Sequence, residues 1–398
     1  MASDRVERLA KLIVDFGANV QRGQIVDLSA NVGNEEVARA VTAAAYDRGA
    51  KFVDVTYYDP HIKHERIARV EDEFLEYIPP WFGQRVVELG RQHAASILLS
   101  GPTAPKLFDD LDAARVGRDI YPRVKEWSEV INAKTVNWCI APAPTPEWAE
   151  LVHPDLEPEH AFERLWDEIT HICRLDEPDP PAAWRERSAQ LKDAAKRLND
   201  RHFDALHFEG DGTDLTVGLL QTSSFHGGGD KTVDGVEFLA NLPTEEVFTA
   251  PDPARVDGTV RATKPLIAYD AEINGLRVRF EGGRAVDIDA DKGADTMRGF
   301  ASRDENACRL GEVSLVDKEG RIGAMDTVFY DILIDENAAS HVAIGDAYKS
   351  TVGEADYDNI NRSEIHLDFM IGGPSVDVTG LTKDGERVPV LRDGVWAI

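Results

Sequence analysis

The order of predicted elements changes near His202, and this change constrains the fold more than any other feature of the 398-residue sequence. Upstream of His202, helical and strand-like patterns alternate. We predict helices at residues 4–16, 34–48, 80–92 and near 106–114, and strands at residues 24–28, 52–58, 95–100 and 134–140. Because such alternation is typical of parallel strands with helical crossovers, the sequence predicts an α/β fold with an open, mostly parallel sheet domain at its N-terminus.

Short strands separated by turn dipeptides replace this pattern downstream of His202. The turns lie in the segments EGDGT, EINGLRV, FEGGRAV, DKEGRI, TKDGERV and RDGVW, which are typical of hairpins. From 141 to 181 the chain is rich in proline and acidic residues, and helical patterns lie in and after this stretch, at 159–172 and 184–198. We therefore predict a domain at 1–200 that includes this helical connector, and a C-terminal α+β, hairpin-rich domain at 201–398.

The charge balance narrows the classes of partner. The sequence has 44 Lys and Arg against 72 Asp and Glu, a net charge of -28, which repels nucleic-acid phosphates and anionic membranes. It contains no run of about 18 apolar residues that would span a bilayer. We expect neither nucleic acid nor membrane as a partner, and we interpret the charge as an acidic surface that aids solubility, with adaptation to a salt-rich cytoplasm as the alternative.

The three cysteines, Cys139, Cys173 and Cys308, are widely spaced and form no CxxC motif. The sequence therefore supports neither a disulfide framework nor a thiolate zinc site. The N-terminal residues carry acids in an amphipathic pattern, unlike a secretion signal. These features predict a protein of the reducing cytoplasm.

Four segments of the second half, NLPTEEVF, LGEVSLV, ENAASHVAIGDAY and HLDF, each bring a residue type that binds divalent metal. The candidate ligands are Glu246, Glu312, His341, Tyr348, His366 and Asp368. This mixed set of oxygen and nitrogen donors suits zinc, cobalt or manganese, whereas a closed structural zinc site would use thiolates. The sequence therefore points to hydrolytic metal chemistry.

Spacing supports the candidates to different degrees. In an alternating strand, His366 and Asp368 point to the same side and reach one ion or two neighbouring ions, although two incidental polar residues on a half-exposed strand would look alike. His341 and Tyr348 are seven residues apart, which places them on one face if the segment is helical. That segment follows a strand-like run at 329–334, and a core His and Tyr pair is the alternative.

The acids of the first two segments have alternative explanations too. Thr244 followed by Glu245 and Glu246 is compatible with a helix N-terminus, where acids favour the helix dipole. However, acids in an apolar setting are costly to bury unless a cation balances them, and this applies equally to Glu312. In that case one of the two adjacent glutamates binds metal while its neighbour serves as a proton shuttle.

The four segments, together with the opening DRVERLAKLIVDFGANVQRGQ, resemble the thermophilic-type metallo-aminopeptidases typified by aminopeptidase T and aminopeptidase S. The resemblance spans the chain, and all six candidate positions carry a suitable donor. It implies two divalent ions (zinc, cobalt, manganese or magnesium) held by those six residues, with Glu312 as a sensible bridge. It also implies an N-terminal α/β domain, a C-terminal metal-bearing domain and a homodimer that encloses the active sites.

The expected activity is hydrolysis of the N-terminal peptide bond of short peptides that have a free N-terminus. Two ions would activate a water and polarise the scissile carbonyl, and Glu245 is the predicted general base. A metal-dependent amidase with a non-peptide substrate and a catalytically silent metal-binding protein are the alternatives. Two further motifs each have two interpretations. The histidines of DPHIKHER form a surface metal site or lie on a solvated helix face, and the glycines of HGGGD form a mobile loop or a turn.

Overall fold

The N-terminal part of the computed structural model, which describes residues 3–268 and 271–398, contains a four-stranded parallel sheet. In spatial order its strands are β2 (Phe52–Tyr58), β1 (Ile25–Asn31), β3 (Ala95–Ser100) and β4 (Asn137–Pro142). All three strand pairs run parallel, with Ile25 opposite Phe52 and Ala95 opposite Asn137. The predicted open parallel sheet is confirmed.

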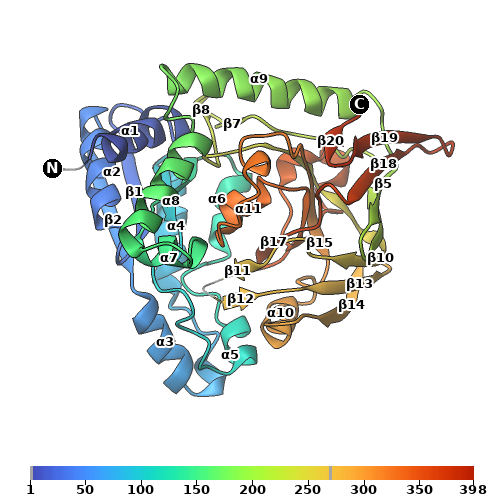
Figure 1. Ribbon diagram of the computed structural model, residues 1–398, viewed down its shortest axis with the longest axis horizontal. Coiled ribbons are helices and arrows are strands. Elements are labelled where there is room, and N and C mark those ends of the chain that lie inside the picture. Colours follow the sequence, from blue (N-terminus) through green and yellow to red (C-terminus); the bar gives the residue numbers. More distant parts are fainter. Residues whose placement is uncertain (1–2, 269–270) are drawn as a thin grey trace.

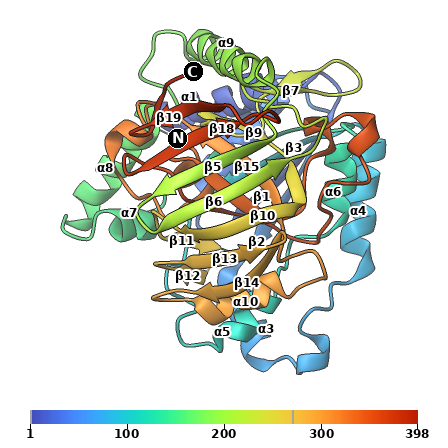
Figure 2. The same cartoon turned by 90° about the vertical axis from the view of Figure 1, so that its right-hand side faces the viewer.

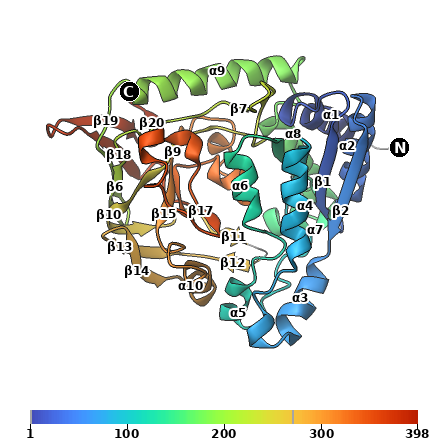
Figure 3. The same cartoon turned by 180° about the vertical axis from the view of Figure 1, so that it is seen from behind.

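Helices cover both faces of this sheet. They are α1 (Asp4–Leu12), α2 (Glu35–Asp47), α4 (Pro80–Arg91) and α6 (Glu126–Asn132), whereas α3 (Pro60–Arg69) and α5 (Ala113–Arg118) lie below the sheet in Figure 1. Val26 and Leu28 of β1 pack in one core with residues of α1 and α2. Asp27 points to the opposite face, as alternation along a strand requires, and pairs there with Arg85 of α4 at 2.5 Å. Helices α4 and α6 lie side by side on that face (Figure 3).

The helix predicted near 106–114 begins later in the structure. Residues 104–111 form turns and bends, and α5 begins only at Ala113. Lys106 has a φ of 66°, in the left-handed region, which interrupts a right-handed helix at that point. The carboxylate of Asp112 accepts the N–H of Arg115 at 3.0 Å. A capping acid rather than the apolar spacing therefore sets the start of this helix.

Three helices connect the two halves: α7 (Pro146–Val152), α8 (Pro158–Ile172) and α9 (Pro180–Asn199). The long helix α9 runs along the top of the molecule in Figure 1 and spans both parts. Its Trp184 packs in the N-terminal core, whereas its Leu191 and Leu198 pack in the C-terminal core. The proposed boundary at residue 200 stays a prediction. Among the described helices, none combines the length and apolar character needed to cross a bilayer.

The C-terminal part is built on an eight-stranded sheet, which faces the viewer in Figure 2. In spatial order its strands are β14 (Arg284–Asp289), β13 (Arg277–Glu281), β10 (Pro251–Arg261), β6 (Thr213–Leu219), β5 (Ala205–Gly210), β18 (Val376–Leu381), β19 (Arg387–Arg392) and β20 (Val395–Trp396). Its adjacent strands are antiparallel. Four predicted turns join hairpins of this sheet, which confirms the hairpin-rich C-terminal part.

A second, four-stranded antiparallel sheet lies inside the molecule, between the eight-stranded sheet and α6 (Figure 1). Its spatial order is β17 (His366–Met370), β16 (His341–Gly345), β15 (Leu310–Val316) and β9 (Glu246–Thr249). Every residue of β15 and β16 is buried. Val313, Val342 and Phe369 of this inner sheet share a core with the eight-stranded sheet. The opposite face of the inner sheet therefore turns toward the N-terminal part.

The strand predicted at 329–334 is wrong, because this segment leads into the short helix α11 (Ile332–Glu336). The carboxylate of Asp331 accepts the N–H of Ile334 at 3.3 Å and so caps the helix. The apolar residues that suggested a strand are buried on the helix instead. Ile334 packs in the N-terminal core together with Phe329.

Candidate metal centre

One face of the inner sheet carries five of the six predicted ligands. Asp368 lies opposite Ala343, which lies opposite Glu312, and His341 lies opposite Ser314. Residues that lie opposite each other on neighbouring strands share a face, and so do residues two apart in one strand. Asp368, Ala343 and Glu312 are therefore on the same face as His341, which is two residues from Ala343. His366 lies two residues before Asp368, and Glu246 follows on the neighbouring strand opposite Val316.

The small side chain at the middle of this face leaves room for a ligand. Ala343 lies between Asp368 and Glu312 in the strand register, and its methyl group does not fill the space that a larger residue would occupy. The neighbouring residues Val342 and Ile344 point to the other face and pack in the core. The alternation of this strand therefore separates an apolar core face from the face that carries the candidate ligands.

His341 lies at the centre of the acids. Its Nε2 is 3.1 Å from Glu246 Oε2, 3.6 Å from Glu312 Oε1 and 3.9 Å from Asp368 Oδ1. Its other ring nitrogen, Nδ1, donates a hydrogen bond to the carbonyl oxygen of Ala339 at 3.1 Å. A carbonyl only accepts, so this contact places the proton on Nδ1 and leaves Nε2 to face the carboxylates, as in metal-binding histidines.

His366 repeats this arrangement on the edge strand. Its Nε2 is 3.4 Å from Asp368 Oδ2 and 3.8 Å from Glu312 Oε2. Its Nδ1 donates to the carbonyl oxygen of Asp346 at 2.8 Å. Glu312 thus presents one oxygen to His341 and the other to His366.

The charges of this centre are not balanced by the protein. Within residues 3–268 and 271–398, no lysine or arginine forms an ion pair with Glu246, Glu312 or Asp368. Burial raises the pKa of Glu312 to about 7. Burial acts to lower the pKa of His341, but hydrogen bonds to Glu246 and Glu312 raise it well above its usual value. In the protein alone, protons have to supply the missing positive charge.

A divalent cation fits this environment better than protons do. The Oδ1 atom of Asp368 is buried and has no hydrogen-bond partner among the described residues. A buried carboxylate oxygen left in that state is costly, and a cation would satisfy it. The donor atoms of Glu246, Glu312 and His341 lie within 4.8 Å of one another, and so do those of Glu312, His366 and Asp368. The residues present therefore fit a site for divalent metal.

Tyr348 reaches the centre from a loop, not from a helix. The helical case considered for residues 341–348 does not apply, because residues 341–345 form β16 and Gly345 has a φ of 105°. The ring of Tyr348 nevertheless lies beside that of His366, with centroids 5.5 Å apart. Burial and the charge of Glu312 raise the pKa of Tyr348. The phenol is therefore neutral unless a cation lies next to it.

The predicted general base, Glu245, lies apart from the centre. Thr244 and the two glutamates do not begin a helix; they follow a cis Leu242–Pro243 bond and enter strand β9. The carboxylate of Glu245 is paired with two arginines instead. Its Oε1 is 2.9 Å from Arg174 Nη2 and its Oε2 is 2.5 Å from Arg187 Nη2. Glu245 comes just before β9, and its carboxylate points to these two arginines, whereas the carboxylate of Glu246 points to His341.

A further acid of the centre, Glu336, was not predicted. It ends helix α11, is buried, and accepts a hydrogen bond from Asn241 Nδ2 at 3.0 Å. Burial raises its pKa well above the usual value, and the charges of Asp368 and Glu246 add to this effect. The only signal in the sequence is one more carboxylate in the segment of His341, within the triplet Asp335-Glu336-Asn337, a composition that is common in turns and helix caps.

Two other motifs have structural explanations. The imidazole of His64 contacts Asp110 at 2.8 Å on the surface, and His61 is exposed on the same helix, α3. Gly227 passes close to β9, where a Cβ atom would lie 2.8 Å from the carbonyl oxygen of Glu246. The glycine segment therefore permits close backbone packing behind the metal centre.

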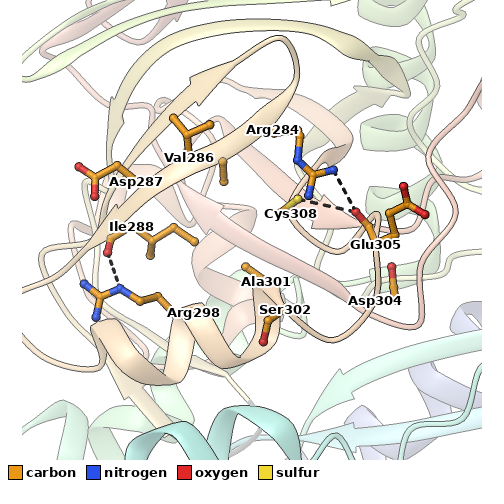
Figure 4. A pocket seen from close by; sticks show the side chains of 11 residues that line it. Arg284, Val286, Asp287, Ile288, Arg298, Ala301, Ser302, Asp304, Glu305 and Cys308 are labelled. Carbon is orange, nitrogen blue, oxygen red and sulfur yellow. Dashed lines mark hydrogen bonds between the residues drawn. The ribbon is translucent and has the colours of Figure 1, made fainter.

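A cavity of about 640 Å³ lies elsewhere, between β14 and α10 (Ala294–Ala301), as Figure 4 shows. Arg284 donates to the carbonyl oxygen of Glu305 at 3.3 Å, and Arg298 donates to that of Ile288 at 3.0 Å. Within the described part of the chain, no candidate metal ligand lines this cavity. Its arginines serve local backbone contacts, and it has no link to the metal centre.

Comparisons with known proteins extend over the whole chain. A family model described as thermophilic metalloprotease (M29) matches residues 2–396. Aminopeptidase T from Thermus aquaticus is 39% identical over 405 residues, which cover 100% of this chain and 99% of that protein. Aminopeptidase AmpS from Bacillus subtilis is 36% identical over 405 residues, with 99% of each chain covered.

The likeness is also structural. The solved structure of wild-type AmpT from Thermus thermophilus matches with a TM-score of 0.86 and 38% sequence identity, covering 99% of each chain. The match includes both the parallel sheet and the inner sheet that carries the candidate ligands. The family model and the full-length relatives place this chain in the thermophilic metalloprotease family M29, as its motifs predicted.

Proposed function

We propose that this metallo-aminopeptidase holds two divalent ions and hydrolyses the N-terminal peptide bond of short peptides. The observation that supports this best is the position of Glu312, which belongs to both groups of donors. Its two oxygens face different imidazoles, those of His341 and His366. A carboxylate placed in this way can serve two ions at once, whereas a single ion would leave one of the groups without a cation.

The donor set bears on the identity of the ions. Carboxylates mixed with imidazoles favour zinc, cobalt or manganese over magnesium, which prefers oxygen ligands. Divalent ions of this kind lower the pKa of a water to near neutrality and polarise a carbonyl. Glu246, Glu312, His341, Tyr348, His366 and Asp368 are the proposed ligands. We add Glu336 to them because it is buried against the same acids.

The protein holds these donors in fixed orientations. Backbone carbonyls of Ala339 and Asp346 fix the rings of His341 and His366, and Ser314 Oγ donates to Glu246 Oε2 at 2.9 Å. Tyr348 lies at the edge of the centre, where its phenol donates a hydrogen bond to a substrate oxygen or, once ionised by a cation, becomes a ligand. Difference absorption at the phenolate band on metal addition separates the two roles, with Tyr348→Phe as the blank.

The role of Glu245 as general base stays a prediction. A general base must be within hydrogen-bond reach of the proton that it accepts. Because both oxygens of Glu245 face arginines, the geometry supports a structural role more than a catalytic one. We expect Glu245→Gln to change stability more than the chemical step.

An N-terminal peptidase must also recognise the free α-amino group of its substrate, which an ion of the centre or one of its acids can do. A metal-dependent amidase would use the same donors but would not require that amino group. The homodimer and the cytoplasmic location are further proposals, which rest on the likeness to the family and on the sequence. Neither nucleic acid nor membrane enters this function.

The test is hydrolysis by metal-stripped protein of aminoacyl p-nitroanilides, short peptides and their N-acetylated forms, before and after addition of cobalt, zinc, manganese or magnesium. We expect metal-restored release of N-terminal residues, no cleavage of acetylated substrates, and two bound ions per chain by titration calorimetry. Equal cleavage of the acetylated peptides would favour the amidase. Two bound ions without activity on any substrate would favour the silent protein, and one bound ion would contradict the dinuclear centre.

A further inference from the structure

The loop that carries Tyr348 is attached to the start of the strand that carries two proposed ligands. This loop, residues 346–349, follows β16 and is called the ligand loop below. The backbone N–H of Asp346 donates to the carbonyl oxygen of Ile365 at 2.7 Å. Because Ile365 directly precedes His366 in the chain, the ligand loop and the start of β17 are fixed to each other.

The backbone of Asp346 also orients a proposed ligand. Its carbonyl oxygen accepts the Nδ1 proton of His366 at 2.8 Å. The Nε2 atom of that ring then faces Asp368 and Glu312, at 3.4 and 3.8 Å. Within the described residues, His366 is the only member of either donor group that forms a hydrogen bond with Asp346. A shift of Asp346 would therefore act on one donor group and not on the other.

The carboxylate of Asp346 joins three parts of the molecule. Its Oδ2 accepts the hydroxyl proton of Ser128 in α6. Its Oδ1 accepts the backbone N–H of Ser363 at 3.1 Å and lies 3.6 Å from Arg362 Nε. Asp346 is buried, so water does not readily replace a lost partner. This side chain thus connects the ligand loop to a helix of the N-terminal half and to the segment that leads into β17.

The contacts around Ser128 fix the direction of its hydroxyl proton. Its Oγ accepts from Asn132 Nδ2 at 3.2 Å and from Arg362 Nη2 at 3.3 Å. A hydroxyl accepts through two lone pairs and donates one proton, so the proton of Ser128 is left for Asp346. Asn132 also accepts the backbone N–H of Lys349 at 2.7 Å. Helix α6, which lies between α4 and the inner sheet in Figure 3, therefore holds the ligand loop at both ends.

We infer that Asp346 is a positioning residue of the metal centre, whose carboxylate holds His366 and Tyr348 in place against α6. The inference rests on the proposed two-ion centre. A displaced His366 would weaken the ion bound by its own donor group, whereas the group of His341 would keep its geometry. Residues that support a metal ligand in this way contribute about 10- to 100-fold in metal affinity or activity. The N-terminal half would thereby shape a centre whose proposed ligands all lie in the C-terminal half.

The first variant is Asp346→Asn, which keeps the shape of the side chain. An amide has one acceptor oxygen where the carboxylate has two, so its nitrogen must face either the Ser128 hydroxyl or the N–H of Ser363. We expect cobalt titration, followed by calorimetry and visible absorption, to show one ion weakened about 10- to 100-fold, with an altered spectrum, and the other ion unchanged. On a dipeptide substrate, kcat should fall more than KM changes.

The second pair of variants tests the contribution of α6. Ser128→Ala removes the donor to Asp346, and Ser128→Thr keeps a hydroxyl. We expect Ser128→Ala to weaken the same ion as Asp346→Asn, but less, because Asn132 still holds the other end of the ligand loop. Ser128→Thr should restore most of the parent affinity. If Asp346→Asn does not fold, this pair decides the inference alone.

A measurement without metal separates positioning from the properties of the loaded enzyme. In metal-free protein with isotope-labelled histidine, magnetic resonance follows the exchange with solvent of the Nδ1 proton of His366. A ring held by a fixed carbonyl oxygen protects this proton, so we expect faster exchange in Asp346→Asn and in Ser128→Ala. The Nδ1 proton of His341, which is bound to the carbonyl oxygen of Ala339, should exchange as in the parent.

The matched control is Asp356→Asn. The carboxylate of Asp356 is also buried and also accepts a hydroxyl proton, that of Thr222 at 2.6 Å, but both residues lie outside the ligand loop and α6. This variant should keep both ion affinities, the cobalt spectrum and the exchange rate of His366.

The inference is overturned if Asp346→Asn and Ser128→Ala keep the parent affinity for both ions and the parent exchange rate. It is also overturned if both ions weaken equally, in step with the thermal midpoint, since that is the result of a general loss of stability. A parent chain that binds a single ion would instead refute the proposed two-ion function. In that case the exchange rates in metal-free protein would still decide whether Asp346 positions His366.

Discussion

Glu245 and Glu246 are neighbours in the sequence, yet they lie in two buried regions that balance their charge in opposite ways. Glu245 points to the connector helices, where Arg174 and Arg187 neutralise it. Glu246 begins strand β9, and its carboxylate faces the imidazole of His341 at 3.1 Å, with no lysine or arginine paired to it among residues 3–268 and 271–398. Two adjacent residues thus serve one region with a closed ion pair and the other with a group of metal-binding donors.

The comparison shows how a buried carboxylate indicates metal. Burial alone is uninformative, because both glutamates are buried. The decisive feature is whether the protein itself supplies the compensating charge. Around Glu245 two arginines do so, whereas no lysine or arginine in the described part of the chain forms an ion pair with Glu246, Glu312 or Asp368, so that protons or an external cation must complete the centre.

The largest expected effect is the loss of Glu312, the proposed shared ligand. Glu312→Gln removes a charge that both donor groups use, so we expect metal binding to weaken at both positions. Activity should fall at least about 1,000-fold, beyond the 10- to 100-fold typical of residues that only support a ligand. Titration calorimetry and peptide hydrolysis measure the two effects. Glu209→Gln, at an exposed position of β5, is the control, and parent-like ion binding by Glu312→Gln would break the comparison.

The second prediction sets the adjacent glutamates against each other. Glu245→Gln leaves two arginines without their counter-charge, so we expect a loss of about 3–5 kcal/mol in the free energy of unfolding, with metal present or absent. Glu246→Gln should weaken metal binding instead and change the stability of metal-free protein less. Denaturant unfolding of both variants, with and without cobalt, measures this.

A compensated variant sharpens the result for Glu245. Arg187→Gln combined with Glu245→Gln removes one charge of each sign, and a double-mutant cycle should recover part of the lost stability. If Glu245→Gln instead keeps the parent stability and metal but loses turnover, its carboxylate is the general base and the structural interpretation fails.

Removal of metal should lower the free energy of unfolding by about 3 kcal/mol in variants that keep the metal centre, and should leave it unchanged in a variant that has lost this centre. An ion at one hundred times its dissociation constant stabilises the fold by about that amount. We therefore expect chelation to lower the unfolding free energy of the parent and of Glu245→Gln equally. Glu312→Gln should not respond. Thermal unfolding before and after dialysis against chelator measures the effect, and an equal response of Glu312→Gln would contradict the assignment of the cation to this centre.

The sequence predicted the N-terminal sheet well because its signals are local. The apolar, β-branched run at 52–58 is the observed strand β2, and the helix predicted at 159–172 is α8 within one residue. The errors fall where one contact decides the conformation. Asp112 and Asp331 each cap a short helix through a single backbone N–H, and periodicity over a window does not detect such a contact.

The candidate site shows the same division between local and long-range information. Motif spacing and family resemblance identified His341, His366 and Asp368, which the fold brings together. Arg174 lies 71 residues from Glu245 in the sequence, so no local pattern predicted their pairing. Glu336 was overlooked because a helix end and a turn look alike in an Asp-Glu-Asn triplet.

The smallest predicted effect concerns a buried acid that has neither arginine nor metal. Asp331 packs beside Asp335, and burial, with the charge of Asp335, raises the pKa of Asp331 from 3.8 to about 7. Because the folded-state pKa is above the unfolded value, the protonated acid favours folding, and this contribution is complete below about pH 4 and lost as the pH rises through about 7. The amino group of Lys264 lies 4.0 Å from the carboxylate of Asp335 and compensates the charge of Asp335, not that of Asp331.

Asp331→Asn should therefore remove a pH dependence and keep the helix cap, since asparagine also accepts a backbone N–H. Between pH 5 and pH 8 we expect the free energy of unfolding of the parent to fall by about 2 kcal/mol more than that of the variant, because proton binding is linked to folding. Urea unfolding of both proteins at the two pH values gives the difference, in which the titration of all other groups cancels. If parent and variant respond equally to pH, then Asp331 is ionised in the fold. Burial without a counter-charge would in that case be tolerated, and the argument from uncompensated acids to metal would lose its force.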